Sequence, residues 1–130
     1  MSRRPASVLI EDMLERIDRI KRAVAGMDHD AFVHDDKTID AVIRNLTVIG
    51  EAANRLSQEF KNRHPDVPWH RIVGLRHRVV HDYFDVDLEL VWRIVETEVP
   101  QLGAWLSDIQ NSAQSAGEHE EDGPNPDVDR

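Results

Sequence analysis

The sequence contains no cysteine, so disulfide bonds, thiolate metal ligands and thiolate nucleophiles are all excluded. Stability must therefore come from packing, and any catalysis falls to histidine, arginine, tyrosine and carboxylates. The sequence also lacks a run of about 18 apolar residues, the length that a membrane-spanning helix needs. Its first residues lead into a charged amphipathic segment, which is unlike a short apolar signal core. We therefore expect a cytoplasmic protein, and its 130 residues fit one domain.

Strand signals are missing too, because no alternating run of β-branched residues is bounded by turn residues, and no internal repeat is present. Apolar residues instead recur at three- and four-residue steps, the spacing of amphipathic helices. This spacing predicts a first helix ending near Gly26 and a second over residues 39–60, with Asp35 or Asp36 as its N-cap. The polar stretch 28–34 between them is expected to be a loop or one short turn.

Prolines and caps place the remaining elements. Pro65 and Pro68 are predicted to end the second helix, because a proline in a helix interior loses a hydrogen bond and clashes. A shorter helix is expected from Pro68 toward Val80. Asp87 can cap a last helix, in which Pro100 predicts a kink. The predicted fold class is therefore all-α, an up-and-down bundle of four to five helices.

The formal net charge of -9 taken alone argues against a nucleic-acid partner, since phosphate binding depends on Lys and Arg. Its distribution changes this conclusion. From Glu118 onward six acidic residues face one Arg, which leaves 15 basic and 19 acidic residues, or -4, on the rest of the chain. The stretch 61–81 holds five Lys or Arg residues against Asp66 alone, together with four of the seven histidines. We expect a domain over residues 1–110 and a disordered acidic tail over 111–130.

The eight residues from Arg76 to Tyr83 concentrate side chains that can act on a phosphodiester. Histidine titrates near neutral pH and can serve as base or acid, and arginine offers a permanently charged fork that fits phosphate oxygens. Tyr83 can position the phosphate or the attacking oxygen. This set suits metal-independent RNA cleavage, in which a base deprotonates the ribose 2′-hydroxyl, a cation stabilises the phosphorane and an acid protonates the leaving oxygen.

The spacing within this run divides it into two stripes. On a continuous helix with about 100° per residue, Arg76 and Tyr83 share one stripe, and His77 and His81 share a neighbouring one. Arg76 and His81 would therefore converge only through long side chains, through a helix break before Tyr83, or through a second copy of the motif across a dimer.

The pattern of Arg76, four residues, His81, one residue and Tyr83 resembles the signature of HepT-like toxins in the HEPN superfamily. The phrases 72–76, 84–87 and 49–52 also resemble that family, and the likeness covers roughly residues 6 to 109. It implies a helical-bundle homodimer with two motifs lining a cleft, RNA cleavage without a metal, and toxicity to the host. It further implies a nucleotidyltransferase antitoxin that can silence the toxin by transferring AMP to the motif tyrosine.

Carried over residue by residue, the resemblance makes Arg76 and His81 catalytic, and Tyr83 both an active-site residue and the AMP acceptor. The family often has Asn directly after the Arg, where this chain has His77, which we interpret as an auxiliary site residue. Arg78 and Glu51 are candidate supporting residues. Glu51 lies beside Gly50, where a close helix approach is possible, and it either holds Arg76 or faces solvent.

Plainer interpretations stay open at this point. Arg76 and Arg78 can form a solvated helix face. His77 and His81 match a helical two-histidine metal pair, but zinc normally takes further protein ligands and no HExxH pattern is present, so we expect no cofactor. His70 is left outside the site as a surface residue. The alternative function is a non-catalytic binding module that partners a nucleotidyltransferase.

Overall fold

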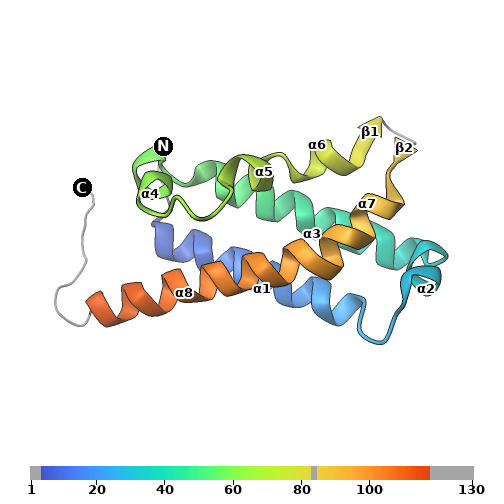
Figure 1. Ribbon diagram of the computed structural model, residues 1–130, viewed down its shortest axis with the longest axis horizontal. Coiled ribbons are helices and arrows are strands. Elements are labelled where there is room, and N and C mark those ends of the chain that lie inside the picture. The colour runs from blue at the N-terminus through green and yellow to red at the C-terminus, as the bar shows by residue number, and fades with distance from the viewer. Residues whose placement is uncertain (1–3, 83–84, 118–130) are drawn as a thin grey trace.

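The computed structural model describes residues 4–82 and 85–117, which form an up-and-down arrangement of four helical rods (Figure 1). The first rod is α1, the second is α3, the third is α5 with α6, and the fourth is continuous through α7, η1 and α8. Their bounds are α1 (Ala6–Ala23), α3 (Asp36–Arg55), α5 (Trp69–Val73), α6 (Leu75–Val79), α7 (Leu88–Arg93), η1 (Ile94–Glu98) and α8 (Val99–Gly117). Among these described residues, no helix combines the length and apolarity that crossing a membrane requires.

The first two rods follow the predicted pattern. The Asp35 side chain caps α3 by accepting a hydrogen bond from the Thr38 backbone N–H at 3.1 Å. Gly26, with φ of 79°, takes the left-handed conformation after α1 that glycine adopts without strain. Between the rods, the stretch predicted as a loop or short turn forms the five-residue helix α2 (His29–Val33).

The prediction that the second helix continues to Phe60 is wrong. Helix α3 ends at Arg55, and Leu56 and Ser57 are extended, with ψ of 141° and 156°. The Ser57 hydroxyl then accepts a hydrogen bond from the Phe60 backbone N–H at 3.0 Å and caps a separate helix, α4 (Gln58–Arg63). Leu56 and Phe60 are both buried, so the apolar period runs across the break and hides it in the sequence.

The third rod also departs from the prediction of one helix from Pro68 toward Val80. It is divided at Gly74 into α5 and α6, and it ends at Val79. The chain then forms strand β1 (Val80–Asp82), which pairs antiparallel with strand β2 (Asp85–Val86). The absence of strands was therefore wrongly predicted, because strands of three and two residues are too short to show alternation. The all-α fold class is confirmed, with this hairpin as a small addition.

The fourth rod begins as predicted, with the Asp87 carboxylate accepting a hydrogen bond from the Leu90 backbone N–H at 3.0 Å. Just before Pro100, where the sequence predicts a kink, the rod contains the π-helical segment η1, in which Val99 N–H donates to the Ile94 carbonyl five residues back. Helix α8 continues to Gly117, past the predicted domain end at residue 110. The disordered tail was predicted over residues 111–130; its residues 111–117 belong to α8 instead, and residues 118–130 lie outside the described residues.

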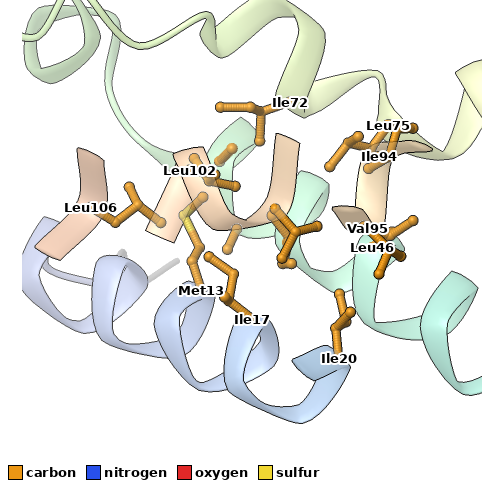
Figure 2. Close-up of a cluster of buried hydrophobic side chains, with 14 of the residues drawn as sticks. Met13, Ile17, Ile20, Leu46, Ile72, Leu75, Ile94, Val95, Leu102 and Leu106 are labelled. Atoms are coloured by element: carbon orange, nitrogen blue, oxygen red, sulfur yellow. The ribbon is translucent and has the colours of Figure 1, made fainter. Parts of the chain in front are cut away.

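One apolar core joins the four rods, and Figure 2 shows part of it. Ile72 and Leu75 enter it from α5 and α6, and Leu102 and Leu106 enter it from α8. The other labelled members are Met13, Ile17, Ile20, Leu46, Ile94 and Val95. Because α5 and α6 turn their aliphatic side chains inward, their polar side chains are presented on the outer surface.

Gly50 allows α3 and α5 to approach each other closely. A Cβ atom added to Gly50 would lie 3.0 Å from the Ile72 carbonyl oxygen and 3.1 Å from the Val73 carbonyl oxygen. The close helix approach predicted at Gly50 is therefore confirmed. This contact sets the distance between α5 and α3 at Gly50. Helix α5 in turn leads directly into the predicted functional run.

Candidate functional site

The predicted functional run crosses a change of secondary structure. Arg76 and His77 are exposed on α6, Val79 is fully buried, and His81 is exposed on β1. The backbone at Val80 is extended, with φ of -112° and ψ of 109°, so a helix break before Tyr83, one of the three alternatives left open by the spacing, is present. His81 therefore does not lie on the helical stripe that the sequence assigned to it. Tyr83 itself lies outside the described residues.

A backbone contact holds this junction in place. The Val79 carbonyl, which lies at the end of α6 and has no partner within the helix, accepts a hydrogen bond from the Asp87 N–H at 2.8 Å. Asp87 also caps α7 with its carboxylate. The base of the hairpin is thus tied to the start of the fourth rod, and the positions of α6 and β1 are coupled to it.

The three arginines of α5 and α6 differ in their partners. Arg78 forms a two-pronged ion pair with Glu98 of η1, with its Nη1 and Nη2 atoms each 2.8 Å from one carboxylate oxygen. Arg71 adds a longer contact of 3.2 Å to the same carboxylate. Arg76 has no hydrogen-bond or ion-pair partner within residues 4–82 and 85–117, so its guanidinium is available to a ligand.

Arg78 is consequently a structural residue. Its side chain is only 21% exposed, so the interpretation of Arg78 as part of a solvated helix face is wrong. Two parallel N–H···O bonds to a carboxylate are among the stronger polar contacts in proteins. These two bonds hold α6 against η1. They affect the neighbouring Arg76 only indirectly, by fixing the position of α6.

The ion pair shifts the pKa values of both partners. Hydrogen bonding from Arg78 lowers the pKa of Glu98, with smaller contributions from the positive charges of Arg78 and Arg71, although partial burial acts in the opposite direction. The hydrogen bond to Glu98 raises the pKa of Arg78. Both side chains are therefore charged at neutral pH.

Glu98→Gln is expected to lower the free energy of unfolding at pH 7 by about 1–2 kcal/mol, because charged hydrogen bonds are lost. Since the pKa of Glu98 lies below its ordinary 4.5 in the folded protein, the pair stabilises the fold above that value. This stabilisation disappears as the pH falls through the folded pKa. Urea denaturation from pH 7 to 3 should show the two proteins converging at the acid end.

Arg71→Ala is the matched control, because it removes only the 3.2 Å contact of a side chain that is 56% exposed. Exposed ion pairs contribute about 1 kcal/mol or less. A loss for Arg71→Ala as large as that for Glu98→Gln would contradict the assignment of the stabilising contact to Arg78.

Glu51 and His77 are both exposed. Glu51 has no ion-pair partner in the described part of the chain, so the structure places it toward solvent and gives no support for a contact with Arg76. His77 follows Arg76 on α6 and has no hydrogen-bond partner there either. The auxiliary role predicted for His77 is compatible with this exposure and stays a prediction.

Within the described ranges, no group of three or more His, Asp or Glu side chains is placed to hold a metal ion. The two-histidine pair considered from the sequence relied on His77 and His81 being one helical turn apart. Because α6 ends at Val79, that helical relation does not exist.

Comparison with known proteins gives consistent matches. The family described as "Ribonuclease HepT-like" matches residues 13–109. "Putative RNase MJ0127" of Methanocaldococcus jannaschii is 39% identical over 120 residues, covering 89% of this chain and 99% of that protein. "Probable ribonuclease HepT" of Thermococcus cleftensis is 37% identical over 93 residues, covering 72% and 84%. "Putative RNase TTE0752" of Caldanaerobacter subterraneus is 33% identical over 100 residues, covering 77% and 89%. No solved structure matches significantly.

Proposed function

Because the chain belongs to the HepT-like ribonuclease family, we propose that it is an endoribonuclease that cleaves RNA at Arg76 and His81. The observation that carries this proposal is the difference between the arginines. Arg71 and Arg78 are engaged by Glu98, whereas Arg76 is exposed beside His77 and has no partner in the described residues. Cleavage of a phosphodiester requires a cation and an acid or base, and the exposed guanidinium of Arg76 and the adjacent exposed imidazole of His77 are groups of these types.

In the proposed reaction, a neutral imidazole removes the proton of the ribose 2′-hydroxyl, and the 2′-oxygen attacks the adjacent phosphorus. The Arg76 guanidinium stabilises the negative charge on the phosphorane oxygens. The bond from phosphorus to the 5′-oxygen then breaks, and an imidazolium protonates that oxygen. The products are a 2′,3′-cyclic phosphate and a 5′-hydroxyl end, and no metal takes part.

We propose that the working enzyme is a homodimer. The reaction needs both a base and an acid. Each chain carries the motif histidine His81 only once, so a second copy of the chain would supply a second His81. Both His77 and His81 lie on the outer surface of the hairpin end, where a second copy can bring its own His81 toward the same phosphate. This arrangement also meets the sequence expectation that two motifs line one cleft.

The test is cleavage of RNA by the purified chain in excess chelator, with analysis of the new ends. We expect cyclic phosphate ends and no cleavage of an oligonucleotide whose 2′-hydroxyls are all methylated, because it lacks the nucleophile. Cleavage that requires a divalent cation, or that persists on the methylated substrate, would overturn the mechanism.

The toxic role is the second part of the proposal. We propose that the chain is the toxin of a toxin–antitoxin pair, and that a nucleotidyltransferase antitoxin silences it by transferring AMP to Tyr83. The family membership and the motif spacing support this assignment. A bulky adenylyl group two residues after His81 would obstruct access of RNA to the motif.

Intact-mass measurement after co-expression with a candidate nucleotidyltransferase antitoxin tests the modification. The wild-type chain is expected to gain the mass of one or more AMP groups and to lose its ribonuclease activity. Tyr83→Phe should show no mass gain. An AMP adduct that survives this substitution would place the acceptor elsewhere.

A further inference from the structure

A polar hollow outside the Arg76–Tyr83 run lies between α3, α4 and α5, with a volume of about 660 Å³. Asn54 from α3 and Gln58, Lys61 and Asn62 from α4 form its polar wall. Pro65, Trp69, His70 and Val73 complete the lining. Neither the family match nor the functional run accounts for this hollow.

The hollow lies close to the functional run along the same rod. Val73, part of its lining, precedes Arg76 by three residues and His77 by four, so its Cα atom lies at most about 11 Å and about 14 Å from theirs. His70 and His77 are both exposed on this rod. Neighbouring nucleotides of an RNA strand can bridge such a distance, so a strand whose phosphate meets Arg76 can place a flanking nucleotide in the hollow.

The polar groups of the hollow suit the edge of a nucleobase. The Gln58 Nε2 donates a hydrogen bond to the Asn62 Oδ1 at 3.0 Å, which leaves the Gln58 carbonyl as an acceptor and the Asn62 amino group as a donor. Asn54 offers a further donor and acceptor. Nucleobase edges present such alternating donors and acceptors, and side-chain amides bind them in single-stranded RNA.

The apolar groups and the charge agree with this ligand. The Trp69 indole N–H is already bound to the His64 carbonyl at 3.0 Å, so Trp69 contributes ring surface to the hollow and no free donor. Pro65 and Val73 add further apolar surface. Lys61 has no carboxylate within 4.0 Å among the described residues, so its ammonium group is available to a phosphate.

We propose that this hollow is a subsite of the ribonuclease that binds the base and phosphate of a nucleotide flanking the cleaved bond. The inference rests on the proposed function and adds to it a source of substrate selection away from the catalytic run. His70, which the sequence analysis left outside the site, is then part of the lining of this subsite. Cleavage should therefore depend on the nucleotide next to the scissile bond.

Fluorescence anisotropy with 2′-O-methyl RNA tests the subsite, because this RNA binds without being cleaved. The full-length chain is titrated with an octanucleotide. The double variant Gln58→Ala/Asn62→Ala is expected to bind the octanucleotide about tenfold more weakly, in line with the loss of one or two hydrogen bonds.

Lys61→Met gives an independent readout. Loss of one phosphate contact to a single strand should reduce the slope of log K against log salt by about 0.7. The controls are Asn111→Ala on α8 and Lys21→Met on α1, both exposed and on other elements. All variants alter partly or fully exposed side chains, and unchanged thermal midpoints confirm that they fold.

The outcomes separate the two proposals. Octanucleotide binding that is unchanged in the Gln58/Asn62 and Lys61 variants overturns the subsite and leaves the proposed function standing. Equal losses in the Asn111 and Lys21 controls also overturn it, because they would show that the losses are not specific to the hollow. No octanucleotide binding by the wild-type chain overturns both proposals.

Discussion

Arg76→Ala is expected to lower the rate of RNA cleavage by about 10²–10³-fold, because it removes the cation that stabilises the negative charge of the phosphorane. His81→Ala should cost about 10²–10⁴-fold through the loss of proton transfer. Both side chains are exposed, and neither has a hydrogen-bond or ion-pair partner among the described residues, so neither substitution should change the thermal midpoint. Single-turnover kinetics at saturating RNA isolates the chemical step from binding.

Controls for these variants use residues of the same type at other places. Arg19→Ala removes an exposed arginine of α1 that pairs with Glu15 one helical turn away, and His34→Ala removes an exposed histidine that follows α2. Both should retain the wild-type rate. A wild-type rate for Arg76→Ala would remove Arg76 from the mechanism, and a rate for His81→Ala within threefold of wild type would do the same for His81.

Arg78→Ala separates a structural arginine from a catalytic one. Because Arg78 contacts Glu98 through two 2.8 Å bonds, its loss leaves a partly buried carboxylate without its main partner. The thermal midpoint should therefore fall, in contrast to Arg76→Ala. At a temperature where both variants are folded, Arg76→Ala should have the lower cleavage rate.

The periodicity of the sequence was sufficient to predict the helical fold class. Individual residue types were sufficient to predict the caps at Asp35 and Asp87 and the close approach at Gly50. The periodicity was insufficient to predict where the helices end. The apolar stripe from α3 continues through Leu56 to Phe60 because both side chains face the core, while a serine cap turns the backbone between them. Burial and backbone direction are separate properties, and periodicity reports only burial.

The functional run shows the same limit at the level of the site. Its residue types and spacing were sufficient to select Arg76 and His81 as candidates. Arg76 and Arg78 could not be distinguished, because the difference depends on Glu98, which lies twenty residues further along the chain. No local spacing links Arg78 to a carboxylate on the next rod. The polar hollow could not be predicted from the sequence either, since α3, α4 and α5 each contribute only part of its lining.

Gly50→Val is expected to destabilise the fold by about 3 kcal/mol, and Gly50→Ala by about 1–2 kcal/mol. In each case the new Cβ meets two backbone carbonyl oxygens, at 3.0 and 3.1 Å, and only a shift of α5 can relieve the contact. Alanine offsets part of this cost, because it favours helix over glycine by about 1 kcal/mol. Urea denaturation measures the loss.

Gly103→Ala on α8 is the matched control. Its added Cβ would lie 3.6 Å from the Ile17 Cγ2 atom, an ordinary van der Waals distance, so the helix preference of alanine should stabilise the protein by about 1 kcal/mol. The two substitutions to alanine, both at buried helical glycines, should thus change stability in opposite directions. Equal effects would mean that α5 can shift away from α3 without a loss of folding free energy. Because α5 continues through Gly74 into α6, its displacement should also lower RNA cleavage in Gly50→Ala and leave Gly103→Ala fully active.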